Sequence, residues 1–171
     1  MAFSGKLWDF PLTLLTPIKG EGMFQGAAAL SLDAKGRLTI PSRHRDGLHS
    51  APAPAAASLV LTAHPDGCLL LYPAAAWEPI RNRVMAFPSL DARFSVWKRL
   101  LVGFAEEVEI DAAWRVLVSP ELRNFAHLEK SVMLVGQGSH FEVWSHEIWD
   151  KQLQQLAAQS QLPPGMEEFA L

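Results

Sequence analysis

The sequence of 171 residues contains a single cysteine, Cys68, and only 19% of its residues are charged. One cysteine cannot form an internal disulfide, and it cannot build a thiolate zinc cage. No uninterrupted apolar run approaches the roughly 20 residues that an α-helix needs to cross a bilayer. These absences favour a cytoplasmic protein without a membrane segment or a structural metal, in which Cys68 is a buried strand thiol.

Sequence signatures of catalysis are also missing. The six histidines lack the paired spacing of a zinc-protease helix. Residues 136–140, GQGSH, lack the third glycine of a dinucleotide-binding fingerprint, and neither a P-loop nor a nucleophile elbow occurs. We therefore assign 136–140 to a hairpin turn. The chain is predicted not to be an enzyme, with no catalytic residue, no metal ligand and no cofactor.

The charge balance is slightly acidic, because 18 Asp and Glu outnumber 15 Lys and Arg and give a formal net charge of −3. A negative net charge argues weakly against a polyanionic partner such as DNA. Residues 23–101, however, carry nine basic and five acidic side chains, or +4, whereas residues 102–171 carry four and eleven, or −7. The objection to DNA therefore applies mainly to the second half of the chain.

Residues 1–22 contain an apolar stretch that faintly imitates the core of a secretion signal. Asp9, Pro11 and Pro17 interrupt or flank this stretch, and no small-x-small cleavage site follows it. We favour the alternative that residues 1–22 are a leader, or an extension from a misassigned start ahead of Met23.

The most informative feature is an internal repeat, which defines the expected organisation. Residues 24–41 match residues 104–120, with DAKGR of the first copy aligned to DAAWR of the second. Further on, residues 59–77 match residues 131–149, and the shift in spacing falls in the Pro/Ala segment APAPAAA of the first copy. The chain is therefore predicted to contain the same unit twice.

Each copy shows alternating apolar positions and turn residues in the order strand, turn, strand, helical turn, strand, turn, strand and helix start. The predicted fold class is mainly β with short helices (α+β), and four short strands per copy favour a shared core and oligomerisation. The expected bounds are a leader at 1–22, repeats at 27–76 and 103–148, a helical connector at 77–102, and a C-terminal helix and tail at 149–171.

The repeated D-x-x-x-R turn is the remaining polar constellation. In a structural interpretation, Asp33 caps the turn, Gly36 supplies a positive φ and Arg37 pairs with Asp33. In a functional one, a hairpin projecting Lys35 and Arg37 enters a DNA groove, where arginine reads guanine and lysine holds phosphate. The two interpretations are compatible, and Asp111 would shape the second turn as Asp33 shapes the first.

Residues 23–48 (MFQGAAALSLDAKGRLTIPSRHRDGL), with the later VLVSPELR and VMLVGQGSHFEVW, closely resemble the MraZ family of bacterial transcriptional regulators, which contain two SpoVT-AbrB-like modules. The resemblance covers residues 23 to about 156. It implies two tandem swapped-hairpin modules with a barrel-like core, assembled into a ring-shaped homo-oligomer. It also implies a nucleoid-associated protein that binds double-stranded DNA at direct repeats in the promoter of the division and cell wall gene cluster, including its own gene.

The resemblance places the DNA surface on the basic residues of the two turns, Lys35, Arg37 and Arg115, with Arg43 as a nearby candidate. The second copy departs from the pattern, because Trp114 stands where the first copy has Gly36. A bulky residue at positive φ costs on the order of 1 kcal/mol or more, so we expect the second turn to adopt another conformation. This departure and the acidic second half keep an alternative open, in which the ring is a structural or protein-interaction assembly.

Overall fold

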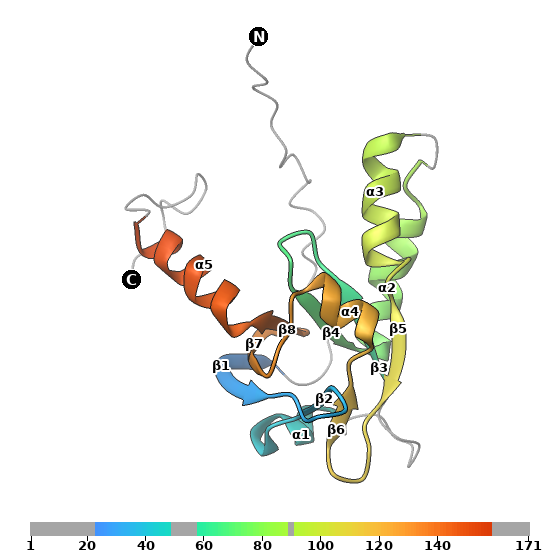
Figure 1. The fold of residues 1–171 in the computed structure, drawn as a ribbon. Coiled ribbons are helices and arrows are strands. Elements are labelled where there is room, and N and C mark those ends of the chain that lie inside the picture. Colours follow the sequence, from blue (N-terminus) through green and yellow to red (C-terminus); the bar gives the residue numbers. More distant parts are fainter. Residues whose placement is uncertain (1–22, 49–57, 89–90, 159–171) are drawn as a thin grey trace, which may run out of the picture.

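A computed structural model describes residues 23–48, 58–88 and 91–158, so the expectations for residues 1–22 and for the tail beyond 158 lie outside the described residues (Figure 1). The first repeat contains β1 (Phe24–Ser31), β2 (Arg37–Thr39), α1 (Ser42–Leu48), β3 (Ser58–Ala63) and β4 (Leu69–Pro73). Two helices follow, α2 (Ala74–Met85) and α3 (Ala92–Leu101). The second repeat contains β5 (Glu106–Glu109), β6 (Arg115–Leu117), α4 (Pro120–Phe125), β7 (Ser131–Gly138) and β8 (Phe141–Ser145), and α5 (His146–Ala158) ends the described chain.

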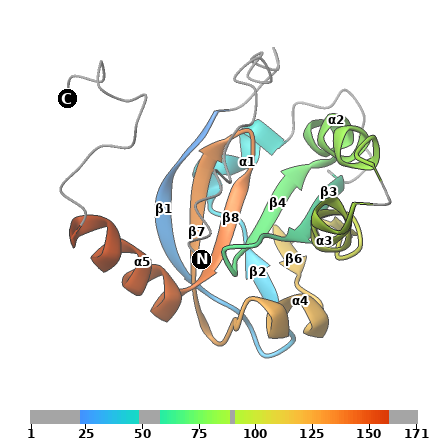
Figure 2. The ribbon, with the colours of Figure 1, turned by 90° about the horizontal axis from the view of Figure 1, so that it is seen from above.

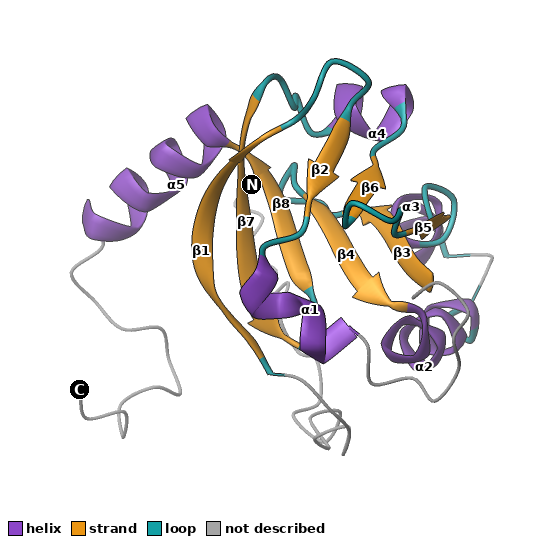
Figure 3. Cartoon of the chain, turned by 90° about the horizontal axis from the view of Figure 1, so that it is seen from below, coloured by secondary structure: helices purple, strands orange, loops and turns teal. Residues whose placement is uncertain are grey.

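The two repeats exchange strands. A six-stranded antiparallel sheet has the order β1-β7-β8-β4-β3-β5, so β1 of the first repeat pairs with the second repeat and β5 of the second pairs with the first. The remaining strands, β2 and β6, form a separate two-stranded ribbon (Figure 3). If each strand is replaced by its equivalent in the other repeat, the result is the same strand order read from the opposite edge of the sheet. The chain therefore has a pseudo-twofold arrangement, with β4 and β8 at the centre of the sheet and β2 beside β6.

The sheet is apolar on both faces because it lies between two layers. One face packs against the ribbon, in a core that includes Leu38 and Val116 of the ribbon and Leu61 and Leu134 of the sheet. The other face packs against the helices that follow each repeat, in a core around Tyr72 and Trp144. Strands β3 and β4 are buried at nearly every position, which explains their continuous apolar sequences.

Over the described residues the strands form two sheets and no closed barrel, because β1 and β5 each end the six-stranded sheet. The mixed α+β class with mainly short strands is confirmed. The expected helical turns after each basic turn are also confirmed, as α1 and α4. Within the described ranges, no helix is both long and apolar enough to span a bilayer.

The helices after the repeats lie on opposite flanks of the sheet, with α5 on one side and the α2–α3 pair on the other (Figures 1 and 2). Helix α3 begins after Asp91, because the Asp91 side chain accepts a hydrogen bond from the backbone N–H of Arg93 and so caps the helix. The first repeat is thus covered by two helices, whereas the second is covered by α5 alone in the described chain.

The hairpin turns of the sheet contain a partly buried histidine. The His140 ring stacks on Tyr72 with centroids 4.4 Å apart. Burial, with a smaller contribution from His64, lowers the pKa of His140 to about 4. The unfolded chain protonates this imidazole near pH 6.5, whereas the folded chain does so only near pH 4. The free energy of unfolding is therefore expected to decrease as the pH is lowered from about 6.5 to 4.

The expected loss is about 2 kcal/mol over this interval, because each pKa unit corresponds to about 1.4 kcal/mol and the ring stays partly exposed. Urea unfolding at several pH values checks it, with His140→Phe as the comparison because phenylalanine keeps the aromatic contact without titrating. Equal pH slopes for the two proteins would contradict this assignment.

Candidate nucleic-acid interface

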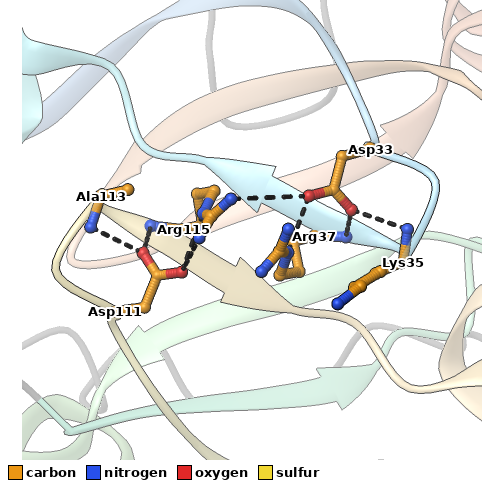
Figure 4. Close-up of polar contacts among 6 residues, drawn as sticks. All are labelled: Asp33, Lys35, Arg37, Asp111, Ala113 and Arg115. Atoms are coloured by element: carbon orange, nitrogen blue, oxygen red, sulfur yellow. Dashed lines mark hydrogen bonds and ion pairs between the residues drawn. The ribbon is translucent and has the colours of Figure 1, made fainter.

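The first basic turn is held by the side chain of Asp33. Its Oδ1 accepts hydrogen bonds from the backbone N–H groups of Lys35 (2.9 Å) and Arg37 (3.0 Å), and its Oδ2 accepts one from Nε of Arg37 (2.7 Å) (Figure 4). Gly36 takes a φ of 79°, as this turn requires. These donors, first the backbone N–H of Arg37, hold the pKa of Asp33 at about 2. Asp33 is therefore ionised at neutral pH and shapes the turn as the sequence predicts.

The second turn has the same conformation, which corrects our expectation. Asp111 accepts hydrogen bonds from the backbone N–H groups of Ala113 and Arg115, both at 2.9 Å, and from Nε of Arg115 at 2.8 Å. These bonds lower the pKa of Asp111. Trp114 adopts a φ of 60° in place of glycine. The guanidinium of Arg45 lies 5.1 Å from the centroid of the Trp114 ring, a cation–π contact that offsets part of the backbone strain.

A second pair of arginines, Arg45 and Arg123, packs on the basic turns, and each lies on the turn of the other repeat. Nε of Arg45 donates to the carbonyl of Ile40 at 3.2 Å, and Nε of Arg123 donates to the carbonyl of Val118 at 3.1 Å. A methyl group at Gly36 would lie only 2.8 Å from the Arg123 guanidinium carbon. Arg123 therefore packs on the first turn as Arg45 packs on the second, which supports a structural role for both.

The β2–β6 ribbon brings the two arginines of the repeated D-x-x-x-R turns to one face. Arg37 pairs with Leu117 and Thr39 pairs with Arg115 across the antiparallel ribbon. Because side chains alternate along a strand, these four residues point outward, while Leu38 and Val116 are buried on the inner face. We call Arg37, Thr39, Arg115 and Leu117, with Lys35, the ribbon face. Figure 4 shows Arg37 and Arg115 between the two aspartate turns.

Sequence reasoning missed Thr39 and Leu117. Both lie two positions after an arginine of the turn motif, and Leu117 is 53% exposed. The period-two alternation of a strand is the signal that identifies them, since it places residues i and i+2 on the same face.

The two arginines differ in how firmly they are held. Asp33 engages Arg37 through Nε at 2.7 Å. Arg115 is engaged by Asp111 through both Nε and Nη2, at 2.8 Å each, and its Nη1 lies 4.0 Å from Asp33. Both side chains remain partly exposed, at 26% and 33%. Arg37 is therefore the better placed of the two to bind a further acceptor.

Arg43 lies apart from this group, on α1. Its Nε donates to Nε2 of His44 at 3.0 Å, and its guanidinium lies beside Gly26 of β1. Much of the positive charge of the first half is carried by the helices rather than by the ribbon, with Arg81 and Arg83 on α2 and a further three basic residues on α3. Lys35, Arg37 and Arg115 against Asp33 and Asp111 leave the ribbon only +1.

The side chains of the ribbon face are suited to binding a polar or anionic partner. Across the three described segments, no group of three or more His, Cys, Asp or Glu side chains is placed to hold a metal ion. A two-stranded ribbon fits the width of the DNA major groove, and arginine there donates two hydrogen bonds to guanine. The ribbon face offers such an arginine on a rigid, hydrogen-bonded support.

Comparison with known proteins identifies the family. Residues 23–99 and 101–164 match the family model described as "MraZ protein, putative antitoxin-like". A protein of Methylobacillus flagellatus named transcriptional regulator MraZ is 60% identical over 87% of this chain and 100% of its own length. Its namesakes in Aromatoleum aromaticum and Azoarcus sp. are 59% and 56% identical, over the same shares of each chain. The chain therefore belongs to the MraZ family of transcriptional regulators.

Proposed function

We propose that this transcriptional regulator binds double-stranded DNA in a sequence-specific manner, at direct repeats in the promoter of the division and cell wall gene cluster, including that of its own gene. The observation that carries the proposal is the ribbon face, on which Arg37 and Arg115 lie side by side, each on a turn ordered by an aspartate. We place the protein in the cytoplasm, associated with the nucleoid.

The chemistry of the ribbon face supports this role. Arg37 is suited to guanine, which presents two acceptors in the major groove, and Leu117 to the methyl group of thymine. Lys35 is exposed at the tip of the first turn and is suited to a phosphate. Arg115 is the second arginine of the face, and Arg43 on α1 is the weaker candidate because its contacts are with His44 and β1.

A single ribbon of net charge +1 supplies few phosphate contacts, so affinity at physiological salt requires several subunits on one DNA. We propose that repeats 27–76 and 103–148 of each chain form one DNA-binding unit, and that the units assemble into a ring. Neighbouring ribbons that face the same way suit direct repeats.

An uncovered helix supports self-association. By the internal repeat, Leu156 of α5 corresponds to Val84 of α2. Val84 is 5% exposed in α2, which packs against α3, whereas Leu156 is 60% exposed and Leu153 is 44% exposed. The second repeat thus lacks in the described chain a counterpart of α3. A neighbouring subunit is the occupant that we propose for this face.

Helix α3 presents a suitable partner surface on the opposite flank. None of its residues is buried, and Arg93, Val96 and Arg99 are exposed at helical spacing. On α5, acidic residues at 147 and 150 precede the two exposed leucines. Exposed apolar side chains on opposite flanks, Val96 of α3 and Leu153 and Leu156 of α5, favour head-to-tail contact, which closes into a ring when the rotation permits.

Leu153→Glu with Leu156→Glu is expected to weaken subunit association about 100-fold, because burial of each leucine contributes about 1.5 kcal/mol or more. Analytical ultracentrifugation measures the result. Gln154→Glu with Gln155→Glu adds the same charge to exposed positions of the same helix and is the matched control. Unchanged mass for the leucine variant, or equal dissociation of both variants, would refute the proposed contact.

A DNase footprint on DNA upstream of the protein's own gene tests the proposed function. We expect protection of short repeats that share one direction. Sequence-specific binding would be contradicted if protection were uniform along the DNA at every protein concentration, or if no protection were seen.

The ribbon has a net charge of only +1 and the second half of the chain is acidic, and these two observations favour one alternative function. In that function the ring is a structural or interaction assembly, and its acidic half binds a basic partner protein. The ordered arginines of the ribbon face favour DNA, since arginine is suited to planar acceptor pairs on base edges.

A further inference from the structure

The two halves of the ribbon have matching backbones and different side chains. The distances from Asp33 and Asp111 to their three hydrogen-bond donors agree within 0.1 Å. Each turn is continued by the opposite strand, since the backbone N–H of Val118 donates to the carbonyl of Gly36 and that of Ile40 donates to the carbonyl of Trp114. As a scaffold, the ribbon is therefore nearly twofold symmetric.

The side chains on this scaffold break the symmetry in four places, one of which is the partly exposed Trp114 of the second turn, where the first turn has Gly36. At the first turn lie Lys35 and, across the ribbon from Arg37, the apolar Leu117. At the second turn the matching positions are Ala113 and Thr39. The arginines differ too, because Arg115 is held by two aspartates and Arg37 by one. The end with Lys35 is thus more cationic, and the outer face of its strands carries the exposed Leu117 where the other end carries Thr39.

We propose that this asymmetry makes each subunit bind DNA in a single orientation, with Lys35 and Leu117 as the residues that determine it. This inference rests on the proposed function and names the residues that give it direction. A symmetric ribbon would bind equally well after rotation by 180° and would select palindromic sites. On that rotation, Lys35 and Leu117 of the observed ribbon would move to the opposite end of the site. A site with a suitably placed phosphate and a thymine methyl at one end therefore fixes the direction of the ribbon.

The expected preference for one orientation is about tenfold or more, equivalent to about 1.4 kcal/mol, from one lysine–phosphate contact and one methyl contact. Positions 35, 39, 113 and 117 are all exposed. The backbone N–H groups that bind Asp33 and Asp111 do not depend on the side chains at 35 and 113. Their exchange is therefore expected to leave the turns intact.

Directed DNA cleavage tests the proposal. Ala34→Cys or Ala112→Cys, both exposed, carries an iron-EDTA reagent at one turn or the other, while buried Cys68, with its raised pKa, stays unlabelled. The labelled full-length protein is bound at about 50 mM salt, where phosphate contacts are strong enough for one ribbon, to a duplex that holds one copy of the protected repeat. The test variant combines Lys35→Ala, Ala113→Lys, Thr39→Leu and Leu117→Thr, which preserves composition and net charge. Circular dichroism and ultracentrifugation verify its fold and assembly.

We expect the two labels to cut opposite flanks of the duplex in the parent protein and to exchange flanks in the fourfold variant. Equal cutting of both flanks by either label, or an unchanged pattern in the variant, would overturn the orientation proposal while leaving DNA binding established. Failure of the unlabelled parent protein to bind the duplex more tightly than scrambled DNA would overturn the proposed function, and the orientation proposal with it.

Discussion

Replacement of Arg37 by alanine is expected to weaken binding to the specific DNA by about 100-fold, because one bidentate arginine–guanine contact contributes about 1 to 3 kcal/mol. The loss has a second source. Asp33 keeps its backbone hydrogen bonds, which lower its pKa, so without the Arg37 side chain its negative charge faces the DNA with less compensation. Fluorescence anisotropy with specific and scrambled duplexes measures the effect.

Two further variants separate recognition from charge. Arg37→Lys keeps the charge without the bidentate geometry, so specific binding is expected to fall while binding to scrambled DNA persists. Arg81→Ala removes the same charge from α2, where Arg81 is exposed and 3.9 Å from Glu78. Retained specific binding by Arg37→Ala, or an equal loss in Arg81→Ala, would disprove the assignment of Arg37.

Gly136→Ala is expected to destabilise the fold by about 3 kcal/mol, the upper range for overpacking a tight site. Gly136 lies opposite Gly26 where β7 pairs with β1. A methyl group there would meet backbone atoms of Gln25 and Phe24 at 2.5 and 2.6 Å, and a backbone cannot move aside as a flexible side chain does. Because β1 is the strand that the first repeat gives to the second, its displacement would separate the repeats.

Gly138→Ala is the matched control in the same strand. Gly138 has a φ of 77° and no atom within 4 Å of the added methyl position, so only backbone strain of about 1 kcal/mol is expected. Thermal and urea unfolding rank the two variants. A smaller loss of stability for Gly136→Ala than for Gly138→Ala would contradict the close approach of β1 to β7.

The sequence predicts well what depends on neighbouring residues. The aspartate-capped turn around Asp33 and the helical turns after each motif follow from local chemistry, and the structure contains both. Strand exchange is beyond such reasoning, because alternation in β1 shows which side chains are buried and not which strand lies beside it.

Trp114 shows where local reasoning is wrong. Intrinsic preference argues against a tryptophan at positive φ, and the structure has one at 60°. The contact with Arg45 comes from the other repeat, 69 positions earlier in the chain, so no local pattern contains it. In the same way, the net charge of each half does not indicate that its arginines lie partly on α2 and α3 rather than on the ribbon face.

The salt dependence of binding to the upstream DNA tests the central claim most directly. If the protein binds DNA through clustered ribbon faces, affinity for the specific duplex is expected to fall about 10³-fold or more between 50 and 200 mM salt, as for six or more phosphate contacts. At every salt concentration, specific DNA should be bound more tightly than scrambled DNA. A flat salt response, or equal affinity for both duplexes, would contradict sequence-specific DNA binding by this surface.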